Sequence, residues 1–214
     1  MKSEAVLAVV SGFAGSGKGS VMKGLMKKYP DHYFLSVSKT TRSPRPGEEE
    51  GREYFFVTDR EFEEDIEKDA LLEYAGYVGH YYGTPKAPVE GALSEGKNVL
   101  LEIEIQGALK VKEKYPEAVL LFLSPPSAEE LKERLTGRGT EDAATIKKRL
   151  KRASEESLGI EKYDYLVIND SLEECIEEVH EILLAERRKT KRQTERIREL
   201  VNGMKVFAEG EETE

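Results

Sequence analysis

The sequence predicts an α/β fold in which helices flank a parallel β-sheet. Four continuous runs of aliphatic and β-branched residues have the length and composition of strands buried on both faces: Ala5–Ser11, Asn98–Glu104, Ala118–Ser124 and Tyr165–Asn169. A helical pattern follows each run, and strands that alternate with helices favour parallel pairing. We therefore expect a core of parallel strands with helices packed around it.

The composition of the chain indicates a soluble globular protein. Its 214 residues suffice for one core domain with insertions, and 35% of them are charged while 38% are hydrophobic. No apolar run approaches the ~18 residues needed to cross a bilayer, and the first residues lack the pattern of a signal peptide. We expect a cytoplasmic protein without a membrane partner. The net charge of −9 also argues against nonspecific binding of nucleic acid.

The single cysteine and the three histidines carry no recognisable catalytic pattern. Cys175 falls at an apolar position of a helical stretch, which predicts a buried thiol and agrees with a reducing compartment. We expect His32, His80 and His180 to be surface or packing residues.

A glycine-rich loop follows the first predicted strand and precedes a predicted helix from about Ser20 to Tyr29. The loop matches G-x-x-x-x-G-K, in which glycines let backbone N–H groups converge on phosphate oxygens while the lysine and the helix N-terminus add positive charge. This order of strand, loop and helix predicts a P-loop NTPase-type core. The expected contacts of the nucleotide are Gly12, Phe13, Ala14, Gly15, Ser16, Gly17, Lys18, Gly19 and Ser20.

One position of this loop departs from the pattern. The residue after the lysine is normally Ser or Thr, whose hydroxyl binds Mg²⁺, but here it is Gly19, and a hydroxyl comes only at Ser20. One residue along a helix turns the side chain by about 100°, so Ser20 does not replace the missing ligand directly. We expect Mg²⁺ to be held by phosphate oxygens and water, near Ser20 and Glu102, without a direct protein ligand.

Two segments interrupt the alternation of strands and helices. Residues 35–84 contain short aromatic and turn-rich stretches, which predict a small antiparallel insertion. Residues 137–159 are helical in pattern and rich in Arg and Lys without a wide apolar face, which predicts a mobile lid or, alternatively, a solvated basic helix face. The predicted core comprises residues 1–34, 85–136 and 160–190.

The predicted extension over residues 191–214 is highly charged. The stretch from Glu186 to Arg198 is basic and has helical propensity, whereas residues 209–214 (EGEETE) are acidic. The basic stretch has two interpretations: a solvated extension of the last helix, or a contact for a partner or RNA.

The most specific motif lies in the first insertion. It reads SVSKTTRSPRPGE over residues 36–48, with Gly51 and Tyr54 beyond it. This block resembles the signature of guanylate kinases, and agreement with that family in order and spacing extends from Val6 to Glu186. The resemblance implies an enzyme that transfers the γ-phosphoryl group of Mg-ATP to GMP, and to dGMP, in purine nucleotide metabolism.

The residue types in this insertion suit a nucleoside monophosphate. Arg42 and Arg45 are framed by turn-forming residues and present two guanidinium groups, which suit a phosphate dianion. Tyr54 and Tyr82 can add hydroxyl donors. We therefore expect these four residues to bind the phosphate of GMP.

Recognition of the base is implied by the resemblance, which assigns it to Ser38, Glu73 and Thr84. Glu73 is chemically apt because a carboxylate can accept from both the N1–H and the N2 amino group of guanine, whereas AMP would leave a buried charge unpaired. The family's next strand carries two aspartates, and here they are Glu102 and Glu104. The resemblance places Glu102 near the waters of the metal and Glu104 near the guanine or the lid.

The expected mechanism needs no general base, because a phosphate oxygen of GMP is already ionised at neutral pH. Catalysis then depends on in-line positioning and on neutralisation of charge by Lys18 and Mg²⁺. Arg138 and Arg149 match the arginines that guanylate kinases bring over the phosphates from the lid. The resemblance alone places Arg134 and Asn169 at the ATP site.

Two other functions remain as alternatives. One is a related P-loop kinase with another acceptor, which the set of guanine-binding residue types disfavours. The other is an inactive guanylate-kinase-like binding module, which the intact glycines and Lys18 disfavour and only Gly19 supports. The chain could be a monomer or a homodimer.

Overall fold

The computed structural model describes residues 5–77, 79–137 and 142–208, and its core is a five-stranded parallel sheet. The strand order is β2-β7-β1-β8-β9, and every neighbouring pair is parallel. The strands are β1 (Leu7–Gly12), β2 (Tyr33–Leu35), β7 (Asn98–Glu102), β8 (Val119–Ser124) and β9 (Tyr165–Ile168). The predicted fold class is confirmed. The three-residue edge strand β2 was not predicted because it is too short to show a pattern.

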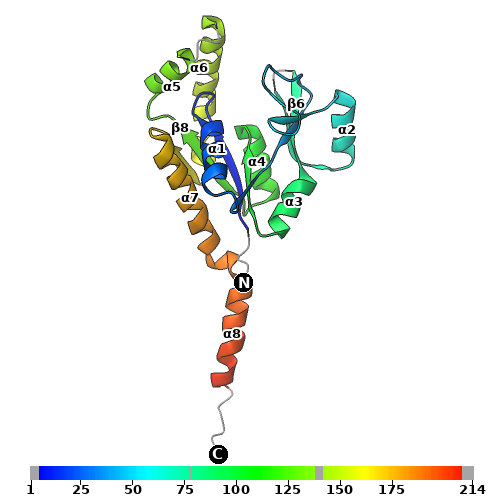
Figure 1. The fold of residues 1–214 in the computed structure, drawn as a ribbon, viewed down its shortest axis with the longest axis vertical. Coiled ribbons are helices and arrows are strands. Elements are labelled where there is room, and N and C mark those ends of the chain that lie inside the picture. The colour runs from blue at the N-terminus through cyan, green and yellow to red at the C-terminus, as the bar shows by residue number, and fades with distance from the viewer. Residues whose placement is uncertain (1–4, 78, 138–141, 209–214) are drawn as a thin grey trace, which may run out of the picture.

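Helices cover both faces of this sheet (Figure 1). They are α1 (Lys18–Lys28), α3 (Lys86–Ser94), α4 (Ile105–Lys114), α5 (Ala128–Thr136), α6 (Ala143–Ser157) and α7 (Leu172–Arg188). Along β1, Ala8 and Val10 pack in the cluster formed with α1 and α7, whereas Leu7 and Val9 pack in the cluster formed with α3 and α4. This alternation explains the continuous apolar run, because each face of a central strand needs its own apolar side chains.

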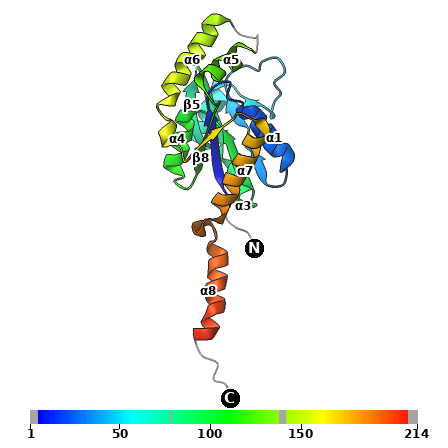
Figure 2. The same cartoon turned by 90° about the vertical axis from the view of Figure 1, so that its left-hand side faces the viewer.

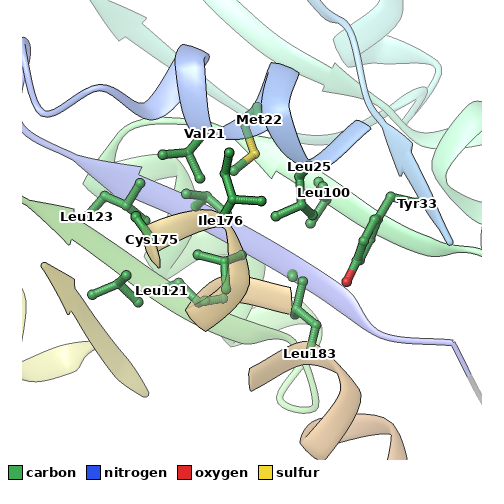
Figure 3. Packing of buried hydrophobic residues seen from close by; sticks show 14 of the residues in the cluster. Val21, Met22, Leu25, Tyr33, Leu100, Leu121, Leu123, Cys175, Ile176 and Leu183 are labelled. Atoms are coloured by element: carbon green, nitrogen blue, oxygen red, sulfur yellow. The ribbon is translucent and has the colours of Figure 1, made fainter. Parts of the chain in front are cut away.

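The cluster between the sheet and the α1–α7 pair is shown in Figure 3. Leu25 of α1 and Leu183 of α7 are completely buried in it, and Cys175 is 1% exposed, as predicted. His180 packs here as well, because its ring stacks on Tyr29 with the centroids 3.6 Å apart. Burial of each large aliphatic side chain contributes roughly 1.5–3 kcal/mol. This packing fixes α1 against the sheet and therefore fixes the loop that precedes it.

The first insertion forms a second sheet, with the order β4-β3-β6-β5. Its elements are β3 (Ser38–Thr40), β4 (Tyr54–Phe56), α2 (Asp59–Glu67), β5 (Leu71–Tyr77) and β6 (His80–Pro85). The pairs β3–β6 and β5–β6 are antiparallel as expected, but β3 and β4 are parallel. The connection 41–53 is long enough for the crossover that a parallel pair requires. Helix α2 begins at a capping box formed by Thr58 and Glu61.

The C-terminal part does not continue the last core helix. Helix α7 ends at Arg188, a 3₁₀ turn η2 spans Thr190–Arg192, and a separate helix α8 (Thr194–Ala208) extends away from the body in both views (Figures 1 and 2). Arg192 is 6% exposed and donates hydrogen bonds to the carbonyl oxygens of Ala5 and Glu117. The helical propensity of this stretch is confirmed, but the buried arginine interrupts the helix.

No helix in the described residues is long and apolar enough to cross a membrane. The predicted boundaries of core, insertion, lid and extension can be placed on the fold: the second sheet lies almost entirely within 35–84, and α6 lies within 137–159. Whether these segments act as separate functional units stays a prediction.

Candidate active site

The phosphate loop connects β1 to α1 where the parallel strand ends. Gly15 and Gly17 have left-handed φ values of 91° and 90°. A Cβ atom on Gly17 would lie 2.3 Å from Nδ2 of Asn169, so only glycine fits. Nδ2 of Asn169 donates to the carbonyl oxygen of Ser16 at 2.7 Å and so braces the loop. Because α1 begins at Lys18, its first backbone N–H groups are available to an anion at the loop.

A cleft of about 360 Å³ lies over this loop. Its lining comprises Ala14, Gly15, Gly17, Lys18, Gly19, Ser20, Lys23, Glu102 and Arg149. The side chains come from the loop, from α1, from the end of β7 and from α6, so distant parts of the chain meet here. Three cations and one carboxylate give the cleft an excess of positive charge, although the whole chain is acidic. This local charge suits a polyphosphate ligand.

Lys18 and Glu102 supply the central charges of the cleft. Nζ of Lys18 donates to the carbonyl oxygens of Gly12 at 2.7 Å and Phe13 at 3.0 Å, which holds it over the loop. The side chain of Glu102 is exposed to the cleft, but the surrounding protein partly desolvates its carboxyl group, and this desolvation raises the pKa of Glu102. The nearby charges of Lys18 and Lys23 lower the same pKa, but by less. Glu102 therefore offers hard oxygen atoms beside the phosphate site.

Glu73 is the buried carboxylate of the second sheet. It lies opposite Thr84 in the β5–β6 pair, and the Thr84 hydroxyl donates to its Oε1 at 2.7 Å. A Cβ atom on Gly107, in the first turn of α4, would lie 2.7 Å from Oε2 of Glu73. Burial raises the pKa of Glu73, which is 4% exposed, and the hydrogen bond from Thr84 lowers it only partly. A ligand that donates to this carboxylate would compensate the cost of its burial.

Arg42 is held in place by Glu48 and by the ring of Tyr54. Its Nη2 donates to both carboxylate oxygens of Glu48 at 2.9 Å, and its guanidinium carbon lies 5.4 Å from the ring centroid of Tyr54. The ring of Tyr54 meets that of Tyr82 edge to face at 5.8 Å. Arg45 is exposed, and its backbone N–H donates to Glu48 at 2.8 Å. Glu48 thus ties the two predicted arginines to one another.

Glu104 connects the second predicted acidic position to the lid segment. It is the N-cap of α4, where Oε1 accepts from the backbone N–H of Gly107 at 3.2 Å. Its Oε2 accepts from Arg152 of α6 at 3.3 Å, and Arg152 also donates to Glu156 at 2.7 Å. The N-terminus of α4 is therefore linked both to α6 and to Glu73.

The remaining predicted residues are placed as follows. Ser38 pairs with Tyr54 in the β3–β4 register, at the same sheet as Glu73. Arg134 on α5 donates to Glu130 at 2.6 Å and is not among the described residues that line the cleft. Arg138 lies outside the described residues.

Sequence reasoning missed three residues that the structure brings to these sites: Lys23, Glu48 and Arg152. Glu48 stands in the same motif as Arg42, so its charge and proximity were a signal for pairing. Lys23 and Arg152 lie on helices rich in charge, and nothing in their local pattern distinguishes them from solvated neighbours.

These features together define a P-loop nucleotide phosphotransferase. They are the glycine loop at the N-terminus of a helix, the lysine over that loop and the cationic cleft at the end of the parallel sheet. The sequence model of the guanylate kinase family matches residues 4–186. The chain belongs to the guanylate kinase family.

Individual proteins agree with this assignment. The guanylate kinase of Caldanaerobacter subterraneus subsp. tengcongensis is 50% identical, covering 87% of this chain and 90% of its own length. That of Lactococcus lactis is 48% identical over 96% of this chain and all of its own length. The crystal structure of guanylate kinase from Anaplasma phagocytophilum superposes with a TM-score of 0.74 at 36% identity, covering 89% of this chain and 90% of that one. The chain is therefore an enzyme that phosphorylates GMP to GDP with ATP as the phosphoryl donor.

Proposed function

We propose that this enzyme binds ATP at the phosphate loop and GMP at the second sheet, with the two sites joined by the segment Glu102–Gly107. Glu102 lines the cleft over the phosphate loop, and Gly107 contacts Glu73. One end of this short segment therefore lies at the proposed ATP site and the other end at the proposed GMP site. In this arrangement the phosphate of a GMP bound at Glu73 would point toward the γ-phosphate of ATP. This shared segment is the observation that carries the proposal.

In this proposal the second sheet selects and orients the acceptor. Glu73, with Thr84 and Ser38 beside it, accepts from the N1–H and N2 amino groups of guanine. Arg42 and Arg45 bind the phosphate with Tyr54 and Tyr82. These contacts do not involve the ribose 2′-hydroxyl, so dGMP is expected to serve as a second acceptor.

The phosphate loop and the lid neutralise the group in transfer. Lys18 reaches the β- and γ-phosphates, and Arg149 approaches the same cleft from α6, with Arg138 as a second lid arginine by family resemblance. An ionised phosphate oxygen of GMP attacks in line, so no residue has to remove a proton. Closure of α6 over the cleft would exclude water, which is the competing acceptor.

Magnesium fits this site as a companion of ATP. In the described part of the chain there is no group of three His, Cys, Asp or Glu side chains arranged for a metal ion. Among the described residues that line the cleft, Glu102 is the one carboxylate, and it suits an outer position on the metal, through water. A bound Mg²⁺ supplies charge neutralisation on the phosphates.

The direct test is ADP formation by the purified protein with Mg-ATP and each of GMP, dGMP, AMP, CMP and UMP. Turnover confined to GMP and dGMP would support the proposed pocket. Equal turnover with another nucleotide would overturn the role of Glu73, and loss of activity only with dGMP would overturn the assignment of dGMP.

Arg42→Ala is expected to raise KM for GMP about 10- to 100-fold, because it removes a charge-assisted hydrogen bond to the acceptor phosphate. The kcat should change much less. Steady-state kinetics with GMP varied at saturating ATP measures both constants. Arg52→Ala is the matched control, since Arg52 lies in the same insertion and is half exposed in surface ion pairs. An unchanged KM for GMP in Arg42→Ala would remove Arg42 from the site.

Arg149→Ala is expected to lower kcat by about 10²-fold, because the positive charge of Arg149 mainly stabilises the negative charge of the phosphoryl group in the transition state. The KM for GMP should stay within about threefold of wild type. The control is Lys148→Ala, since Lys148 is the exposed neighbour on the same helix. Equal turnover in both variants would show that α6 acts as a solvated helix and not as a lid.

The raised pKa of Glu73 predicts a weaker GMP complex at low pH. Because burial raises this pKa above its ordinary value, the free enzyme takes up a proton on Glu73 as the pH falls toward that raised value. A protonated carboxyl can accept fewer hydrogen bonds from guanine, so KM for GMP should rise as the pH falls from neutrality toward the raised pKa of Glu73. The phosphate of GMP also titrates in this range. The contribution of Glu73 is obtained by comparing how KM for GMP depends on pH in wild type and in Glu73→Gln. Identical pH dependence in the two proteins would contradict the prediction.

A further inference from the structure

Helix α6 presents two arginines on one side. Arg149 lines the cleft over the phosphate loop, whereas Arg152, three residues further along, donates from Nη2 to Oε2 of Glu104 at 3.3 Å. Residues three apart are neighbours on a helix surface, so a movement of the helix displaces both side chains together. Figure 2 shows that the C-terminal part of α6 lies beside α4, which begins directly after Glu104. Phosphoryl transfer as proposed above uses Arg149 and gives Arg152 no role.

Helix α6 has few apolar contacts with the core. The structure describes all 15 of its residues, and Ala153 is the one buried residue among them. Ile146 and Leu150 are partly buried against the cluster that contains Phe13 of the phosphate loop. A helix with few buried apolar residues moves more easily relative to the core than a well-packed one. Polar contacts with neighbouring elements therefore matter for the position of α6 over the cleft.

Glu104 is the fixed end of the ion pair with Arg152. It is the N-cap of α4, and its Oε1 accepts from the backbone N–H of Gly107 at 3.2 Å. Helix α4 is itself anchored, because Ala108 and Val111 are completely buried against the sheet. Burial raises the pKa of Glu104, and the hydrogen bond from Gly107 and the charge of Arg152 lower it. Arg152 thus favours the ionised carboxylate with which it pairs.

The guanidinium group of Arg152 is also fixed on its own helix. Its Nε donates to Glu156 at 2.7 Å, one turn further along α6. The planar guanidinium can therefore hold one carboxylate on α6 and one on α4 at the same time. The side chains of Arg152 and Glu104 are 32% and 30% exposed, so water screens their pair less than a fully exposed pair. This pair connects a loosely packed helix to a fixed one.

We propose that Arg152 is a positioning residue, which binds α6 to Glu104 and thereby holds Arg149 over the phosphoryl group in transfer. The inference rests on the proposed role of Arg149 in the cleft. Electrostatic stabilisation of a transition state requires the charge at a fixed position, and a displacement of about 1 Å can lower a rate about 10²-fold. Loss of the pair would let α6 shift on its apolar contacts, and Arg149 would shift with it. Arg152 therefore affects turnover and not the affinity for GMP.

The test is a double-mutant cycle between Arg152→Gln and Arg149→Ala, with kcat measured at saturating ATP and GMP. Arg152→Gln alone should lower kcat about tenfold, while KM for GMP stays within about threefold of wild type. In the Arg149→Ala background the same substitution should lower kcat less than about twofold, because the side chain that Arg152 positions is already absent. Equal factors in the two backgrounds, which a general loss of structure would give, would overturn the proposal.

Two further variants test the partner of Arg152 and the specificity of the effect. Glu104→Gln keeps an oxygen that can cap α4 but removes the charge, so it should lower kcat about as much as Arg152→Gln. The protein with both substitutions should be within about twofold of the less active single variant. Lys151→Gln is the matched control, because Lys151 is 81% exposed and pairs with Glu155 on the same helix. Its kcat should change less than about twofold.

The outcomes that contradict this inference differ from those that contradict the proposed function. An unchanged kcat in Arg152→Gln or in Glu104→Gln, or an equal fall in Lys151→Gln, would overturn the positioning role. A rise of KM for GMP in Arg152→Gln without a change of kcat would place its effect at the acceptor site and would overturn that role as well. If Arg149→Ala itself left kcat unchanged, the proposed function of the lid would be wrong, and the inference would be overturned with it.

Discussion

Glu73→Gln is expected to lower kcat/KM for GMP by about 10³-fold while the fold stays intact. The substitution keeps the shape of the side chain but replaces one acceptor oxygen with an amide donor. Guanine presents donors at both N1 and N2, so the new amide group opposes one of them inside a pocket where water cannot relieve the conflict. Glu73 is only 4% exposed, which makes this mismatch costly.

The same variant should be at least as stable as wild type. Burial raises the pKa of Glu73, so at neutral pH the ionised carboxylate costs folding free energy in the absence of GMP. Removal of that charge should leave Tm unchanged or higher, and thermal unfolding without nucleotide measures this. A large fall in activity together with an unchanged or higher Tm separates recognition of the base from a general loss of structure.

Two comparisons make the Glu73 prediction specific. IMP lacks the N2 amino group, so its kcat/KM should fall less than that of GMP, and the preference for GMP over IMP should shrink. Glu90→Gln on α3 changes an exposed carboxylate in the same way and should have no effect. If Glu73→Gln retained the wild-type preference for GMP over IMP, another residue would read the N2 amino group.

Lys18→Met is expected to lower kcat by about 10³-fold, because it removes the positive charge that we propose to neutralise the transferring group. Methionine keeps much of the aliphatic volume, so the change is mainly electrostatic. The backbone N–H groups of the loop and the N-terminus of α1 remain, and ATP should still bind, measurably by calorimetry. The KM for GMP should change little, since Glu73 and Arg42, the residues proposed to bind GMP, belong to the insertion that forms the other sheet.

The control for Lys18 is Lys27→Met, at the exposed end of the same helix. Lys18 also donates to the carbonyl oxygens of Gly12 and Phe13, so its loss should lower stability by about 1 kcal/mol and Tm by a few degrees. Assays at temperatures well below Tm ensure that this loss of stability does not contribute to the measured change in kcat. A kcat within about tenfold of wild type would mean that other cations, such as Lys23 and Arg149, carry the charge neutralisation.

The sequence by itself determined the core strands, the phosphate loop and the family. These features are local, because each is a pattern within a short stretch of sequence: an apolar run, a glycine pattern, or a block such as residues 36–48. Within such a stretch, neighbours in the chain determine the steric and hydrogen-bonding preferences of the backbone. The α/β class followed from their order. The burial of Cys175 was predictable for the same reason, whereas the sequence left open whether His180 lies at the surface or packs in the core.

Only the tertiary structure decided which distant residues meet. It placed Gly107 against Glu73, Arg152 on Glu104 and Arg149 beside the phosphate loop, contacts that depend on how the helices and the second sheet pack. It also paired β3 with β4 in parallel and ended α7 by burying Arg192. A helical pattern shows which face is polar, but many charged residues share that face. Which of them is desolvated and paired depends on groups far away in the sequence, because only folding brings those groups within hydrogen-bonding distance.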